Sequence, residues 1–166
     1  MRILLKGKHM ILGLILIVVG IIIDQGTKAL AFSHFLMNTD YPAIPGLFKF
    51  HLLENDGAAW GMFSNKLWFF IIITVVALGF LTYLAKDFDL KNHAIYSASY
   101  ILVCVGTIGN FIDRLFNNGY VKDFLTFDFI NFPSFNFADM CMTVGCIFLV
   151  IDILFGETGA RWTRNT

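Results

Sequence analysis

Hydrophobic residues gather in four long runs along the chain, and the stretches between them are more polar. The runs cover about residues 10–32, 67–85, 94–116 and 138–155. Each is close to the roughly 20 residues that a tilted helix needs to cross about 30 Å of hydrocarbon. Membrane barrels use shorter, alternating strands instead. The pattern therefore predicts an all-α membrane protein, a single domain over residues 1–166 with four transmembrane helices.

The first long connection between the runs does not follow the pattern of a helix. Two prolines and a glycine interrupt it at positions 42–46, and Asn55-Asp56-Gly57 is typical of a turn. Between them, residues 47–53 mix aromatic and aliphatic side chains as a short strand does. We therefore expect a small β-containing segment here. Trp60 and the aromatic residues after it would suit the headgroup region.

The distribution of basic residues predicts the orientation. Only 14% of the residues are charged, and the net charge is zero, which argues against a nucleic-acid-binding surface. Seven of the 12 basic residues lie at the termini or between the second and third runs: Arg2, Lys6, Lys8, Lys86, Lys91, Arg161 and Arg164. By the positive-inside rule both termini are cytoplasmic, and segments 33–66 and 117–137 are extracytoplasmic.

The N-terminal run could instead be a cleaved signal peptide. It has a basic start, an apolar stretch over residues 11–23, and Ala29-Leu30-Ala31 as a possible cleavage site. Asp24, Gln25 and Lys28 lie between the apolar stretch and that site and argue against cleavage.

Aspartates inside or at the ends of the apolar runs are the strongest indication of function. They are Asp24, Asp113, Asp123, Asp139 and Asp152. A carboxylate at the centre of a bilayer costs roughly 2.5–3.5 kcal/mol, so such groups usually have partners or do chemistry. The three cysteines and four histidines show no metal-ligand spacing, so we expect no metal site. The sequence therefore predicts a carboxylate-rich polar site inside a membrane protein.

The third run carries a polar stripe. Gly106, Asn110, Asp113 and Arg114 are spaced i, i+4, i+7 and i+8, which places them on one side of a helix. They could support a site, or Asp113 and Arg114 could form a structural ion pair. For Asp113 and Arg114 we favour packing and a structural ion pair near the outer interface, so they resemble supports of a site more than its reactive groups.

Asp123 and Asp139 are the candidates for the chemistry itself. Fifteen residues separate them, so the chain can fold them together, and Asn136 can share a helix face with Asp139. Two adjacent carboxylates tend to share a proton, which is the arrangement used by aspartic proteases. Alternatively, Asp139 only favours a helix N-terminus, and Asp123 pairs with Lys122 or Arg114. Spacing alone leaves both interpretations open.

Two further motifs have both a simple and a functional interpretation. Asp24 and Lys28 are spaced i, i+4, so they can form an intrahelical pair, and they could also brace the outer segment. Asn55 could contact a substrate backbone or belong only to a turn. We assign no role to Asp128 or Asp152.

Five motifs together resemble the lipoprotein signal peptidases, the type II prolipoprotein signal peptidases of the intramembrane aspartyl protease family. In order they are Asp24-Gln25-Gly26-Thr27-Lys28, Asn55-Asp56-Gly57-Ala58-Ala59, Gly106 through Arg114, Val121-Lys122-Asp123-Phe124 and Phe135-Asn136-Phe137-Ala138-Asp139. Met140-Cys141 departs from the small polar residues common at that point of the family but leaves the carboxylates in place.

The resemblance implies an intramembrane aspartyl endopeptidase of the bacterial cytoplasmic membrane, active near its outer face. Asp123 and Asp139 would be catalytic. Substrate-binding or supporting roles would fall to Asp24, Lys28, Asn55, Gly57, Asn110, Asp113, Arg114 and Asn136. The implied substrates are diacylglyceryl-modified prolipoproteins, cut just before the lipidated cysteine. The resemblance further implies contacts with membrane lipids, inhibition by the cyclic peptide globomycin, and no cofactor.

Two other classes of protein remain compatible with the residues. A small proton-coupled carrier could use Asp113, Asp123 and Asp139 as a relay, although carriers place such groups near the bilayer midplane. A non-enzymatic scaffold could use buried charges to pair its helices.

Overall fold

A computed structural model describes residues 2–57, 62–63 and 66–156 of the chain. Its long helices are α1 (Arg2–His34), α2 (Leu67–Leu84), α3 (Ala94–Phe116) and α4 (Phe137–Phe155). The strands are β1 (Asp40–Ile44), β2 (Phe48–Asn55) and β3 (Val121–Phe127). Four helices are long and apolar enough to cross a membrane, and a small antiparallel sheet accompanies them. The predicted fold class is thus confirmed.

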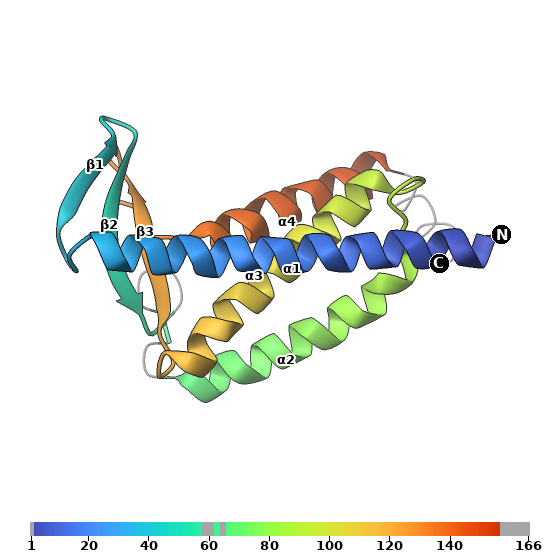
Figure 1. Cartoon of the computed structure of the whole chain (residues 1–166), viewed down its shortest axis with the longest axis horizontal. Coiled ribbons are helices and arrows are strands. Elements are labelled where there is room, and N and C mark those ends of the chain that lie inside the picture. Colours follow the sequence, from blue (N-terminus) through green and yellow to red (C-terminus); the bar gives the residue numbers. More distant parts are fainter. Residues whose placement is uncertain (1, 58–61, 64–65, 157–166) are drawn as a thin grey trace.

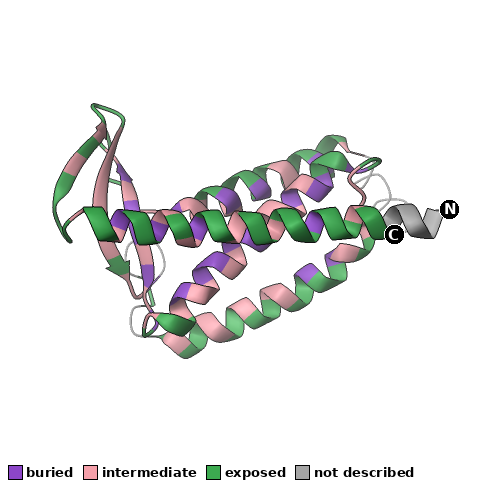
Figure 2. Cartoon of the chain, viewed as in Figure 1, coloured by how far each residue is buried: buried purple, intermediate pink, exposed green. Residues whose placement is uncertain are grey.

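The helices run side by side, and the sheet closes one end of the bundle (Figure 1). The N-terminal end of α1 and the C-terminal end of α4 lie at the opposite end. Most outward-facing positions of the helices are exposed (Figure 2), and many carry large apolar side chains such as Ile22, Val76 and Leu154. In a membrane protein these side chains face lipid, so their exposure carries no hydrophobic penalty.

Helix α3 is the centre of the bundle, since it packs against each of the other three long helices. Small residues allow α4 to approach it closely. A Cβ atom on Gly145 would lie 2.8 Å from Val103 and 3.1 Å from Leu102. The Ser99 hydroxyl also donates a 2.7 Å hydrogen bond to the Gly145 carbonyl, satisfying a buried donor across the interface. The closely packed α3–α4 pair is therefore a rigid support for the residues at the ends of these two helices.

The sheet has the order β1-β2-β3, with both pairs antiparallel. The expected strand near residues 47–53 is present as β2. The prediction that no helix forms around Pro42 is confirmed, since Pro42 lies within β1 opposite Lys49. An edge strand tolerates a residue without an N–H. Strand β3 had not been expected, and it brings Asp123 opposite Leu53.

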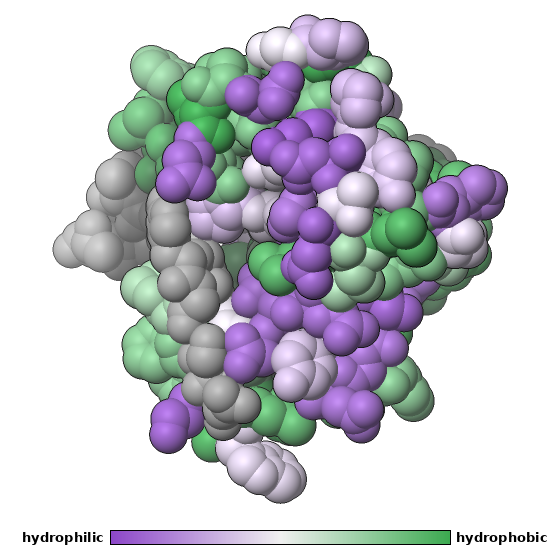
Figure 3. Space-filling view, turned by 90° about the vertical axis from the view of Figure 1, so that its left-hand side faces the viewer, coloured by the Kyte–Doolittle hydropathy of each residue, from purple (hydrophilic) through white to green (hydrophobic). Residues whose placement is uncertain are grey.

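The sheet end of the molecule differs in character from the helices. Hydrophilic residues gather over much of this face (Figure 3), whereas the sides of the bundle are apolar. The expectation for Trp60 falls on a residue outside the described ranges.

Candidate active site

Asp123 on β3 and Asp139 in the first turn of α4 meet where the sheet joins the bundle. Both contact Asn136. Its side-chain Nδ2 donates to Asp123 Oδ1 at 2.6 Å, and its backbone N–H donates to Asp139 Oδ2 at 3.0 Å. One residue thus holds both carboxylates, which local spacing alone could not establish.

The chain forms this arrangement because Asn136 is the N-cap of α4. Its Oδ1 accepts a 3.0 Å hydrogen bond from the Asp139 N–H, while Asp139 accepts from the Asn136 N–H in return. This reciprocal capping box satisfies two helix-end donors at once. Asn136 is fully buried, and its amide has a second acceptor in Asn110 Oδ1 at 3.1 Å. The start of α4 is therefore rigidly tied to the site.

Asp123 is almost completely buried, and both of its oxygens accept hydrogen bonds. Besides the bond from Asn136, Asn55 Nδ2 donates to Oδ2 at 3.0 Å. Burial, and then the neighbouring Asp139 carboxylate, raise the pKa of Asp123 to about 7, although the two amide donors and Lys28 act in the opposite direction. Near neutral pH this carboxyl group can therefore both hold and release a proton.

The buried ammonium group of Lys28 lies close to the site and pairs with two further carboxylates. Lys28 Nζ lies 2.9 Å from Asp24 Oδ2 and 2.9 Å from Asp113 Oδ2, and all three side chains are essentially inaccessible. The expected Asp24–Lys28 pair is present, and Asp24 reaches further, accepting a 3.0 Å bond from the Ala138 N–H at the start of α4. The pair therefore connects α1 to α3 and α4.

Lys28 also fixes the orientation of Asn110. It donates to Asn110 Oδ1 at 3.0 Å, and an ammonium group can only donate. The Asn110 amide therefore points toward Asp139 and donates to its Oδ1 at 2.7 Å. Lys28 on α1 thus orients the Asn110 amide on α3 so that it donates to Asp139 on α4.

The suggested Asp113–Arg114 ion pair is not formed among the described residues. Asp113 pairs with Lys28 instead and accepts from the Lys122 N–H at 3.1 Å. Arg114 donates to the Gly57 carbonyl at 3.1 Å, and its guanidinium lies 4.3 Å from the centre of the Phe70 ring. Consecutive residues on a helix point about 100° apart, so the two side chains reach different neighbours.

The ion pair that the sequence analysis considered for Asp123 is also absent among the described residues. The hydrogen-bond partners of Asp123 are Asn55 and Asn136, not Lys122 or Arg114. Asn55 fulfils both interpretations of its motif. Its Oδ1 accepts from the Gly57 N–H at 2.9 Å within the turn, and its Nδ2 donates to Asp123 in the site. Ala58 and Ala59 of the same motif lie outside the described residues.

Gln25 is a site residue that the sequence analysis did not identify. Its Nε2 lies 3.0 Å from Asp24 Oδ2, 3.1 Å from Asp113 Oδ1 and 3.2 Å from the Gly109 carbonyl. Its position within the first motif, between Asp24 and Lys28, is the sequence feature that could have identified it as a site residue.

Asp128 and Asp152, to which the sequence analysis assigned no role, stand apart from this site. Asp128 accepts from the Gly46 N–H in the sheet, and Asp152 is buried far along α4. Within the described ranges, no three His, Cys, Asp or Glu residues are arranged to hold a metal ion. The chemistry available at the site is that of two close carboxylates with amide donors.

Comparison with known proteins assigns the chain to a family. Residues 16–155 match the family described as Signal peptidase (SPase) II. A lipoprotein signal peptidase of Lactiplantibacillus plantarum is 46% identical over 141 residues, covering 85% of this chain and 93% of that protein. One from Latilactobacillus sakei is 39% identical, covering 90% and 95%.

Solved structures agree with this assignment. A bacterial membrane enzyme determined at 2.3 Å resolution superimposes with a TM-score of 0.78 at 33% identity, covering 86% of this chain and 87% of that one. A second, at 1.9 Å resolution, gives a TM-score of 0.76 at the same identity. The chain is thus a multi-pass membrane protein and belongs to the signal peptidase II family, the lipoprotein signal peptidases, which are aspartic proteases.

Proposed function

We propose that this enzyme removes the signal peptide from diacylglyceryl-modified prolipoproteins by cutting just before the lipidated cysteine, with Asp123 and Asp139 as the catalytic pair. The observation that carries the proposal is the position of Asn136, which hydrogen-bonds to both carboxylates from one buried site. Groups held in this way are preorganised for proton transfer and do not have to be ordered when substrate arrives.

In this mechanism the pair holds a water molecule beside the scissile carbonyl. The oxygen of the water attacks the carbonyl carbon, and Asp139 accepts the proton that the water loses. Asp123 donates its proton to the carbonyl oxygen, as a carboxyl group with a pKa of about 7 can do near neutral pH. Collapse of the tetrahedral intermediate breaks the C–N bond and returns a proton to the leaving amine. The products are the signal peptide, ending in a new carboxylate, and the lipidated cysteine with a free amino group.

The other site residues position these groups. Asn110, ordered by Lys28, and Asn136 hold the two carboxylates. Arg114 donates to the Gly57 carbonyl, so the turn over Asn55-Asp56-Gly57 is anchored beside the pair. We propose that Asn55 and Gly57 border the path of the substrate backbone. Globomycin, as a cyclic peptide, would compete for the same place.

We propose that the sheet end, and with it the site, faces the outside of the cytoplasmic membrane. In the described part of the chain, Lys8, Lys86 and Lys91 belong to the opposite end of the bundle, where α1 begins and where α2 leads into α3 (Figure 1). The positive-inside rule places that end in the cytoplasm. Labelling of single cysteines at Lys91 and in the β1–β2 turn with an impermeant reagent tests this orientation.

The decisive experiment is cleavage of a purified diacylglyceryl-modified prolipoprotein in nanodiscs. The wild-type protein should release the signal peptide, and Asp123→Asn and Asp139→Asn should each lower the rate by roughly 10²–10⁴-fold or more. Asp128→Asn, which leaves an acceptor for the Gly46 N–H, is the matched control and should cleave normally. Full activity in both dyad variants would overturn the mechanism. Proton transport without cleavage would favour the carrier.

A further inference from the structure

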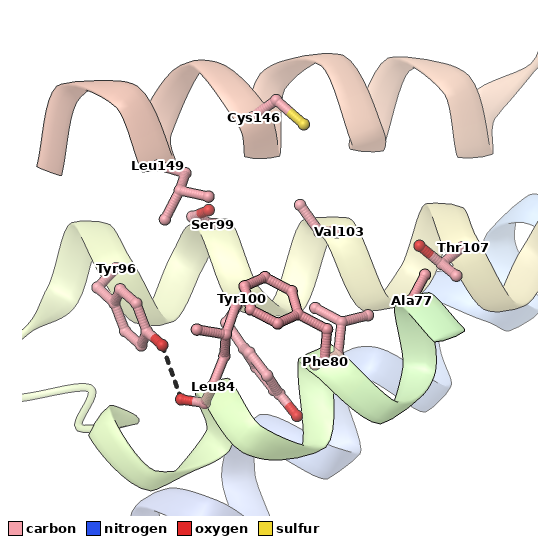
Figure 4. A pocket seen from close by; sticks show the side chains of 11 residues that line it. Ala77, Phe80, Leu84, Tyr96, Ser99, Tyr100, Val103, Thr107, Cys146 and Leu149 are labelled. Carbon is pink, nitrogen blue, oxygen red and sulfur yellow. Dashed lines mark hydrogen bonds between the residues drawn. The ribbon is translucent and has the colours of Figure 1, made fainter. Parts of the chain in front are cut away.

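An apolar groove lies between α2, α3 and α4, on the side of the bundle away from α1 (Figure 4). The free space within it is about 140 Å³. Residues of all three helices line it, among them Ala77 and Phe80 of α2, Tyr100 and Val103 of α3, and Cys146 and Leu149 of α4. None of these belongs to the polar site.

Two hydroxyl groups in the walls of the groove are already engaged within the protein. The Tyr96 hydroxyl donates to the Leu84 carbonyl at 2.7 Å, and the Ser99 hydroxyl donates to the Gly145 carbonyl at 2.7 Å. The surface presented to an occupant is therefore hydrocarbon, which selects an apolar partner.

The groove is open toward the lipid. Helix α2 is held to the bundle mainly through α3, whereas α4 packs along α3, so a gap remains between α2 and α4. Phe80 at this gap is 55% exposed, and Cys146 is exposed as well. A partner already embedded in the bilayer can thus enter from the side.

The groove begins about one helical turn from the active site. Cys146 follows Asp139 by seven residues on α4, and Thr107, also in the groove, precedes Asn110 by three on α3. At 1.5 Å per residue, Cys146 lies about 10 Å deeper in the membrane than the carboxylate pair. From Thr107 to Tyr96 the groove extends a further 11 residues, or about 16 Å, toward the end that carries the termini.

We propose that this groove binds the apolar segment of the substrate's signal peptide as a helix; this inference rests on the proposed function. The segment precedes the scissile bond and must lead from the carboxylate pair toward the cytoplasmic end, which is the direction of the groove. Its length matches three turns of helix, and small side chains at Ala77, Ser99 and Thr107 allow the backbone of a helix to approach. Binding here is of the helix-in-groove type.

Filling the groove tests this assignment. Ala77→Trp places a large side chain in it, and Val76→Trp, on the 66% exposed face of the same helix at the same depth, is the matched control. Two substrates are compared: a full-length diacylglyceryl prolipoprotein, and a short lipopeptide that spans the cleavage site but lacks the apolar segment. Ala77→Trp should lower kcat/KM for the long substrate roughly tenfold, mainly through KM, and leave cleavage of the short one unchanged.

The other outcomes contradict the proposal in distinguishable ways. Equal losses on both substrates would mean that the groove holds an acyl chain or only supports the fold. No loss on either would mean that the groove is not used. Wild-type protein that cleaves neither substrate would overturn the proposed function itself.

Disulfide cross-linking tests occupancy independently of turnover. Cys146 is exposed, whereas Cys104 and Cys141 are buried, so it is the thiol of choice. In the Asp139→Asn enzyme, single cysteines along the apolar segment should cross-link to Cys146 with helical periodicity, centred about seven residues before the cleavage site. Cys146→Ser should abolish the product. A complete absence of cross-links along the segment would overturn the proposal.

Discussion

Asn136 and Asp139 cap one another: each side chain accepts a 3.0 Å hydrogen bond from the backbone N–H of the other. The same asparagine donates to Asp123 at 2.6 Å. Asn136 therefore both caps α4 and joins the two carboxylates. A substitution at this position can separate the two roles.

Asn136→Ser should separate them. Serine is a good N-cap, so the start of α4 keeps its acceptor, but the amide donor to Asp123 is lost. We expect the variant to retain most of its thermal stability and to lose most of its peptidase activity. Asn136→Ala should lose activity to the same degree and, in addition, roughly 1 kcal/mol of stability or more from the missing cap. Comparable melting temperatures for the two variants would contradict this division.

The pH dependence of cleavage should report the protonation of Asp123. Its pKa is raised from the ordinary value of 3.8 to about 7, so activity that needs the proton should fall as pH rises through that value. The hydrogen bond from Asn55 lowers the pKa of Asp123. Asn55→Ala should therefore move the falling limb of kcat/KM to higher pH, whatever its effect on the maximal rate. Asn92→Ala, at the other end of the molecule, should leave the limb in place.

The same shift has a consequence for stability. A carboxyl group with a raised pKa in the folded state stabilises the fold fully below its ordinary pKa of 3.8, and this contribution is lost as pH rises through about 7. Asp123→Asn, which cannot ionise, should remove this part of the pH dependence of the melting temperature. An unchanged pH dependence in that variant would show that Asp123 is not the group responsible.

Lys28→Met should unfold or strongly destabilise the protein. It would leave the buried carboxylates of Asp24 and Asp113 without their cation, a loss typically of about 3–5 kcal/mol. Lys49→Met is the control, because the Lys49–Asp40 pair is partly exposed and such pairs contribute at most about 1 kcal/mol. Melting of both variants in the same detergent measures the difference. Equal effects would mean that the buried cluster is not held by its charge.

Gly109→Ala should disrupt the packing behind the carboxylates. An added Cβ would lie 2.5 Å from Asp24 Oδ2 and 3.2 Å from Ala138 Cβ, so α1 or α4 would have to move. In α2, Gly79 has nothing within 4 Å of such an atom, and Gly79→Ala should be neutral or stabilising by about 0.5–1 kcal/mol. Activity and melting temperature should fall together only in Gly109→Ala.

The sequence predicted the four helices and the residues that gather at the candidate site because both leave local patterns. Apolar runs identify helices, and the five motifs identify the positions of Asp123, Asp139 and Asn136. Its failures concern contacts between distant residues. The pairing of Lys28 with Asp113 spans 85 positions and the contact of Asn55 with Asp123 spans 68, and no local periodicity reports either.

The absence of strands β1 and β3 from the prediction has a related cause. Proline is normally read as a break, but a strand at the edge of a sheet tolerates it. Val121–Phe127 contains two charged residues, and as an isolated segment it is not distinctive. It becomes a strand because β2 lies beside it, which is a property of the folded chain.

One carboxylate of the pair belongs to the sheet and the other to the bundle, with Asn136 at the joint between them. A rocking of the sheet on the ends of the helices would therefore widen or narrow the space for the attacking water. Because helices adjust to bilayer thickness by tilting, we expect the rate of the proposed reaction to vary with the length of the lipid chains around the protein.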